Sequence, residues 1–156
     1  MKIKFKKEAD KVILECTRDD GSMTWCKVQP GMIYHEMLHY LLESATKTES
    51  AFYGLLKKGF DILDFESERA DRPKELLPSN LSDDAIAIEI IAGIMQHDAR
   101  IRFENIEKTI EEIFVEKSVS SELLKQINIE ALRKDFGDMI IRWKSLQEGE
   151  YLEFSI

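Results

Sequence analysis

Two histidines four residues apart carry the clearest chemistry in this chain. They stand in the run His35-Glu36-Met37-Leu38-His39, in the first turns of a predicted helix. Since a helix turns by about 100° per residue, the two imidazoles lie on one face, one turn apart. Such a pair can hold one zinc ion, and a glutamate directly after the first histidine can act as a general base. The pattern therefore predicts a zinc site with His35 and His39 as ligands and Glu36 as the catalytic base.

A third ligand has to come from another element of the fold. Glu43 is on the same helix, but it is about 12 Å from His35 along the axis, whereas ligand atoms lie about 2 Å from zinc. Glu89 is the preferred candidate, because it is a carboxylate on an otherwise apolar helix and a buried carboxylate needs a partner. Three alternatives remain open for this ligand: His97, Glu66 and Glu68.

The elements that must position these residues follow from hydrophobic periodicity. Alternation with period two predicts strands near the N-terminus, over 11–18, over 23–29 and over 151–156. Helical spacing predicts helices over 32–47, 51–63, 82–96, 101–117 and 129–146, with a charged loop over 64–81. The helix over 82–96 is apolar nearly all round, which predicts a central position, and Gly93 on it would let another backbone approach closely. The expected fold class is α+β in one domain: an antiparallel β-meander (1–30), a helical part (31–148) and a terminal strand (149–156) that can join the meander.

The hairpin at Asp19-Asp20-Gly21-Ser22 allows its register to be predicted. A two-residue loop would set Leu14 opposite a lysine, whereas a three-residue loop with Gly21 in the left-handed conformation sets Leu14 opposite Cys26. Because opposed residues share a face of the sheet, the three-residue loop is the better prediction. Cys16 and Cys26 then become diagonal neighbours, and we expect them to be buried, reduced thiols.

Composition restricts the classes of partner. The net charge is −8, with 33% charged and 44% hydrophobic residues, so binding to nucleic acid is disfavoured. The sequence starts directly in a charged, alternating strand instead of a signal peptide, and no apolar run reaches the length of a membrane span. We therefore expect a cytoplasmic protein that acts on an unidentified small molecule or peptide and binds neither nucleic acid nor membrane.

Two resemblances accompany these patterns. The segment 35–39 resembles the zincin metallopeptidases, in which two histidines bind zinc, the glutamate activates water, and a strand ahead of the helix holds the substrate. The chain lacks the glycine and third histidine that follow the motif in metzincins. In the glutamate-type zincins a later helix supplies the third ligand, which is compatible with Glu89.

The second resemblance covers most of the chain and is to a family of small uncharacterised bacterial proteins with an H-[D/E]-x-x-H-[Y/F] motif. The matching pieces are His35, Glu36, His39, Tyr40, Glu43, Phe52 to Leu55, Gly59-Phe60-Asp61, Trp143 and Gly149 to Leu152. The residue after the first histidine is usually aspartate in that family, so this resemblance does not support a peptidase base at position 36. It implies no known activity.

Three functional interpretations remain open at this stage. The first is a zinc-dependent hydrolase, with a metal-bound water of lowered pKa. The second is a non-catalytic interaction protein without metal. In it the histidines are hydrogen-bonded to Glu36, to Glu43 or to the sheet, or they lie with Glu36 and Glu43 on the polar stripe that helical periodicity predicts to be exposed to solvent. The third is a structural metal or small-ligand site without turnover.

Overall fold

The described residues form one antiparallel sheet and six α-helices, as expected for the α+β class. The computed structural model describes residues 1–68 and 70–156, and the side chain of Glu66 also lies outside the described part. The strands are β1 (Lys2–Glu8), β2 (Lys11–Thr17), β3 (Met23–Val28) and β4 (Tyr151–Ser155), in the order β3-β2-β1-β4. The helices are α1 (Ile33–Thr46), α2 (Phe52–Lys57), α3 (Ile62–Glu66), α4 (Asp83–Ile101), α5 (Ile106–Lys117) and α6 (Ile129–Ser145).

The hairpin between β2 and β3 has the predicted register. Arg18 and Ser22 close the loop through a backbone hydrogen bond of 2.8 Å, and Gly21 has a φ of 85°. This left-handed conformation is available to glycine at little cost, and it sets Leu14 opposite Cys26. Both cysteines are buried on the inner face, and no disulfide joins them.

The C-terminal strand completes the sheet beside the first strand. β4 pairs antiparallel with β1 and places Leu152 opposite Phe5. Since alternate residues of each strand point to one face, Ile3, Phe5 and Leu152 are buried on the same side. The prediction that the terminal strand joins the meander is therefore confirmed.

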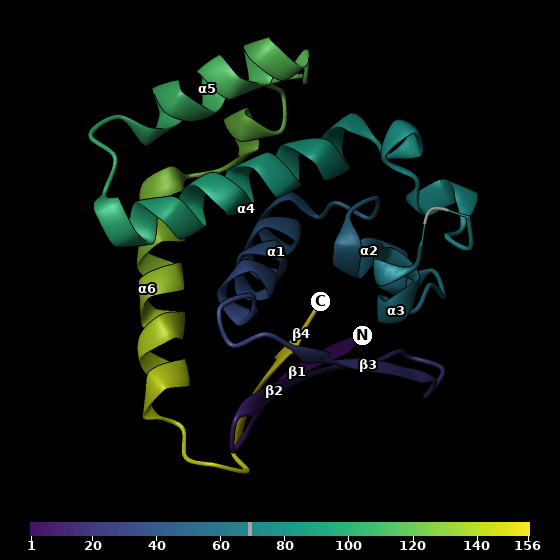
Figure 1. The fold of residues 1–156 in the computed structure, drawn as a ribbon. Helices are drawn as coiled ribbons and strands as arrows, with labels where there is room; N and C mark the ends of the chain where they lie inside the picture. The colour runs from purple at the N-terminus through teal and green to yellow at the C-terminus, as the bar shows by residue number, and fades with distance from the viewer. Residues whose placement is uncertain (69) are drawn as a thin grey trace.

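The helices all cover one face of the sheet, and α1 is the innermost of them. Figure 1 shows α1 between the sheet and α4, with α6 along its side. The helix over 82–96, which the sequence placed at the centre of the helical layer, corresponds to α4. It packs on the side of α1 away from the sheet (Figure 1) and contacts α1, α5 and α6. Helical periodicity predicted that His39 and Glu43 are exposed to solvent. Both are buried, because α1 is enclosed on several sides.

Three local predictions were wrong. The helix expected over 51–63 ends at Lys57, because Gly59 turns the chain with a φ of 106° before α3 begins. The segment 64–81 was expected to be a loop, yet it contains the end of α3 and two short 3-10 turns, Lys74–Leu76 and Pro78–Asn80. Gly93 is not a point of close approach, since among the described residues a Cβ built on it would meet nothing within 4 Å outside its own helix.

A buried ion pair joins α4 to α6. Arg133 contacts both carboxylate oxygens of Asp98 at 2.8 Å, and the backbone N–H of Phe103 donates to Asp98 at 2.7 Å. The side chains of Asp98 and Arg133 are only 2% and 11% exposed. Burial alone would raise the pKa of Asp98, but the guanidinium of Arg133 and the Phe103 N–H outweigh it, and the pKa lies below its ordinary value.

Replacing Asp98 by asparagine is therefore expected to lower the free energy of unfolding by about 2–3 kcal/mol at pH 7, because the charge of Arg133 would lose its partner. Since the folded pKa of Asp98 is lowered, this contribution is complete above about pH 4 and is lost as the pH falls through the folded pKa. Urea denaturation of both proteins at several pH values measures this. Asp138→Asn is the control, because its ion pair with Lys134 is exposed and should contribute under about 0.5 kcal/mol. A similarly small effect of Asp98→Asn would contradict the prediction.

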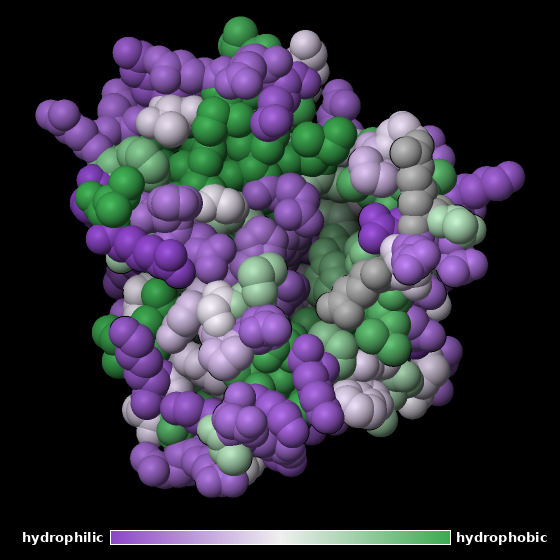
Figure 2. All heavy atoms as spheres, in the orientation of Figure 1, coloured by the Kyte–Doolittle hydropathy of each residue, from purple (hydrophilic) through white to green (hydrophobic). Residues whose placement is uncertain are grey.

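The surface of the face in Figure 2 is mostly hydrophilic, with an apolar patch in the region between α4 and α5. Exposed apolar residues of these two helices include Ile101 and Val115. Among the described helices, none is both long and apolar enough to cross a lipid bilayer.

Candidate metal centre

Helix α1 brings the two histidine side chains into contact. The Nε2 atoms of His35 and His39 are 3.1 Å apart, and their ring centres are separated by 4.7 Å. This arrangement follows from the four-residue spacing on one helical face. His39 is almost completely buried, whereas His35 keeps 17% of its side chain exposed. The pair therefore presents two ring nitrogens at the boundary between the core and solvent.

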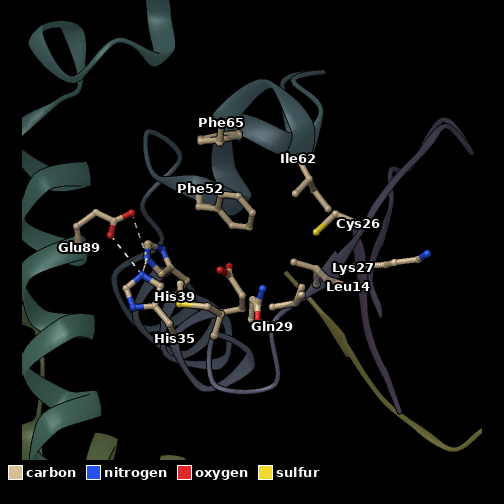
Figure 3. A pocket seen from close by; sticks show the side chains of 13 residues that line it. Leu14, Cys26, Lys27, Gln29, His35, His39, Phe52, Ile62, Phe65 and Glu89 are labelled. Atoms are coloured by element: carbon tan, nitrogen blue, oxygen red, sulfur yellow. Dashed lines mark hydrogen bonds and ion pairs between the residues drawn. The ribbon is translucent and has the colours of Figure 1, made fainter. Parts of the chain in front are cut away.

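Glu89 reaches the same point from α4. Its Oε2 lies 3.3 Å from His35 Nε2, and its Oε1 lies 3.4 Å from His39 Nε2. Figure 3 shows the carboxylate of Glu89 directed at both imidazoles from the neighbouring helix. Gln96, two turns further along α4, donates to the backbone carbonyl of Gly31 at 3.1 Å, which helps to hold α4 against the start of α1. The structure thus brings together the three side chains that the sequence proposed as ligands.

Two of the three alternative third ligands, His97 and Glu68, do not join this cluster. His97 is exposed on α4, and Glu68 is exposed after α3; among the described side chains, the group whose ligand atoms converge consists of His35, His39 and Glu89. The side chain of Glu66 lies outside the described part of the structure. The geometry therefore favours Glu89 over His97 and Glu68.

The distances within the cluster match those between ligands of zinc. Ligand atoms about 2.0–2.1 Å from a tetrahedral ion are about 3.3–3.4 Å from one another. The three contacts here measure 3.1, 3.3 and 3.4 Å. Glu89 contacts the two imidazoles through different oxygens, so it would bind one ion with both oxygens or after a small rotation of its carboxylate. Two imidazoles and a carboxylate are also the donor set of many catalytic zinc sites.

The other ring nitrogen of His39 is held by Glu43. The distance from His39 Nδ1 to Glu43 Oε1 is 3.2 Å, and Glu43 is only 1% exposed. Glu43 is not a ligand of the cluster, in agreement with the distance argument from the sequence. The interpretation without metal expected a contact of this kind. It is also what a metal-binding imidazole needs, because a hydrogen bond at one ring nitrogen fixes the other toward the ion.

Glu43 is itself held by the start of α2. Its oxygens accept hydrogen bonds from the backbone N–H groups of Tyr53 at 3.2 Å and Gly54 at 3.0 Å. The residue preceding this helix, Ala51, provides no side-chain cap. Because the first N–H groups of a helix lack partners within it, the carboxylate of Glu43 serves as their cap. One buried carboxylate therefore links α1, α2 and the imidazole of His39.

Neighbouring glutamates and histidines shift the pKa values of His39 and Glu89, and each shift stabilises the charged form. Burial alone would lower the pKa of His39, but Glu43 and Glu89 outweigh it and raise that pKa above its ordinary value. Burial opposes ionisation of Glu89, yet the two histidines hold the pKa of its carboxyl well below the usual range. Since a metal binds the neutral imidazole, the ion and a proton would compete for His39.

Glu36, the predicted base, lines the same hollow as the cluster. Burial raises the pKa of its carboxyl, while His39 and His35 act in the opposite direction. The backbone carbonyl of Glu36 accepts a hydrogen bond of 3.2 Å from the hydroxyl of the fully buried Tyr53. This contact fixes the first turns of α1 against α2.

The cluster lies at one end of a pocket of about 480 Å³. Residues of β2, β3, α1, α2, α3 and α4 contribute to its lining, and Figure 3 shows the imidazoles and Glu89 at one side of it. The periodicity of the sequence identified the residues at this side but not the adjacent wall, which contains Phe52, Ile62 and Phe65. These belong to a region whose helical boundaries were predicted wrongly.

Comparison of the chain with protein-family models, with curated proteins and with solved structures finds no match. The geometry of the cluster and its pocket is therefore the basis for assigning a function.

Proposed function

We propose that this protein is a zinc-dependent hydrolase in which His35, His39 and Glu89 bind the ion and Glu36 is the general base. The observation that carries the proposal is the convergence of two imidazole nitrogens and a carboxylate within 3.1–3.4 Å of one another. They do so at the side of a pocket that Glu36 also lines. A structural zinc site would be closed by a fourth protein ligand, whereas a catalytic site keeps one position open. Among the described residues only these three converge, which favours the catalytic kind.

The roles of the side chains follow from their chemistry. Bound zinc would polarise a carbonyl group and lower the pKa of a water molecule toward about 7. Glu36 would accept a proton from the attacking water as the new bond from oxygen to carbonyl carbon forms. Glu36 would then donate that proton to the leaving group as its bond to the carbonyl carbon breaks. Glu43 would keep His39 oriented throughout.

The zinc content of the purified protein tests the proposal. After incubation with excess zinc and desalting, elemental analysis should find about one zinc ion per chain. Less than about a tenth of an ion per chain would rule out a tight site and would leave the interpretation without metal. Retained zinc without hydrolysis of any amide or ester substrate would instead favour the structural site.

The isosteric change Glu43→Gln tests the orientation of His39. We expect the affinity for zinc to fall by about 10- to 100-fold, because an amide cannot match the carboxylate at Nδ1 of His39 while accepting from both Tyr53 and Gly54. Competition with a chromophoric chelator, at a temperature where the variant is folded, measures the dissociation constant. Glu112→Gln, at a side chain that is 67% exposed on α5, is the control. Equal affinities in the two variants would show that Glu43 has no part in metal binding.

A further inference from the structure

The pocket wall beside the imidazoles is aromatic. The ring of Phe52 lies 5.9 Å from that of His39 in an edge arrangement, and Phe65 packs against Phe52 with ring centres 4.9 Å apart. Both phenylalanines are half-buried, while Ile62 next to them is buried. Figure 3 shows these three side chains on one side of the pocket. Apolar surface therefore begins directly at the candidate zinc ligands.

The sheet contributes further apolar residues to the lining, namely Leu14 of β2 with Cys26 and Val28 of β3. Figure 3 shows Leu14 and Cys26 on the side of the pocket away from the imidazoles, with the cysteine sulfur directed into the pocket. The surface in Figure 2 is hollowed between the positions of α1 and α2, with apolar residues on the walls of the hollow. A mostly apolar pocket with a few convergent polar groups is the usual form of a ligand site.

The aromatic wall is fixed in place by hydrogen bonds to the hairpin. Arg18 donates to the backbone carbonyl of Leu56 at 2.6 Å and also to that of Phe60, in the turn between α2 and α3. The N–H of Ile62 donates to the hydroxyl of Thr24 at 3.0 Å, in the buried part of β3. These contacts hold the segment that carries Phe52 and Phe65, so the wall is formed before a ligand binds.

The apolar walls select against charged groups on the substrate. Lys27 is the one lysine among the described residues that line the pocket, and the aromatic wall itself offers no charged partner. A charged substituent held against Phe52 and Phe65 would lose its hydration without gaining an ion pair there. A neutral apolar substituent meets no such penalty and gains by leaving water.

We propose that the aromatic wall of Phe52 and Phe65 binds an aromatic or branched aliphatic group that is adjacent to the hydrolysed bond of the substrate. The substrate class is thus an amide or ester with a bulky apolar substituent at that position. This inference rests on the proposed function, because the wall is relevant to hydrolysis only if the cluster holds zinc.

Binding of two hydroxamates to the zinc-loaded protein tests the wall separately from the ion. Acetohydroxamic acid can chelate zinc but has only a methyl group, whereas 3-phenylpropanohydroxamic acid presents a phenyl ring to the pocket. We expect the phenyl compound to bind about 10- to 100-fold more tightly, because its ring is buried against the wall. Succinic monohydroxamate, which carries a carboxylate, should bind no better than the methyl compound. Isothermal titration of zinc-loaded protein gives the three affinities.

The variant Phe65→Ala decides whether the wall causes this preference. It should reduce the affinity for the phenyl compound at least about tenfold and that for acetohydroxamic acid by less than about threefold. Phe103→Ala removes a half-buried ring outside the pocket lining and should preserve the ratio.

The outcomes distinguish a failure of the aromatic wall from a failure of the zinc site. A zinc-loaded protein that binds the methyl and phenyl compounds equally, or a Phe65→Ala variant with an unchanged ratio, overturns the inference about the wall and leaves the zinc proposal standing. A protein that retains no zinc is recognised from its metal content, and it overturns both proposals.

Discussion

Replacing His35 or His39 by alanine is expected to abolish stoichiometric zinc binding. Each change removes one of three converging ligands, and the remaining two cannot complete the four-coordinate shell that zinc prefers. The matched control is His97→Ala, because His97 is exposed and lies outside the cluster. Elemental analysis of the three variants after zinc loading and desalting gives the result. Equal zinc content in the His39→Ala and His97→Ala variants would exclude the cluster as the binding site.

Two glutamate variants separate the ligand from the base. Glu89→Gln should weaken zinc binding, because it removes the charge of the third ligand. Glu36→Gln should retain zinc and lower any hydrolytic rate by about 10²- to 10⁴-fold, the usual contribution of a general base. Loss of zinc in the Glu36→Gln variant would indicate that Glu36 is a ligand, and an unchanged rate would exclude it as the base.

Gly54→Ala is expected to destabilise the fold by about 3 kcal/mol, near the upper end for overpacked sites. A Cβ at this position would lie 2.4 Å from the backbone carbonyl carbon of Glu49 and 2.5 Å from its Cα. Because these are backbone atoms, the connection between α1 and α2 would have to move. The N–H of Gly54 would then shift away from Glu43, so the affinity of the folded protein for zinc should fall as well.

The control for this change is Gly137→Ala on α6, where an added Cβ would have nothing within 4 Å. That variant should be unchanged or more stable by up to about 1 kcal/mol, since alanine favours the helix over glycine. Thermal and urea denaturation measure both proteins. Stabilities of Gly54→Ala and wild type within about 0.5 kcal/mol would show that the chain relaxes around the methyl group.

The sequence by itself determined the features that depend on neighbouring residues. The register of Leu14 opposite Cys26 follows from Gly21, because glycine adopts the left-handed conformation of a three-residue loop at little cost. The pairing of His35 with His39 follows from the pitch of one helix. The α+β class follows from strand alternation at both ends of the chain and helical spacing between them.

The tertiary structure decided what lies beside these local elements. Periodicity assigned His39 and Glu43 to an exposed stripe, but the packing of α2 and α4 against α1 buries both. It preferred Glu89 as the third ligand but left His97, Glu66 and Glu68 open, and the packing of α4 against α1 is what brings Glu89 to the imidazoles. Contacts between helices far apart in sequence depend on the shape of many side chains together. No short pattern encodes them. The candidate ligand pair was therefore visible in the sequence, whereas the choice of Glu89 over His97 and Glu68, the contact with Glu43 and the aromatic wall became visible only in the fold.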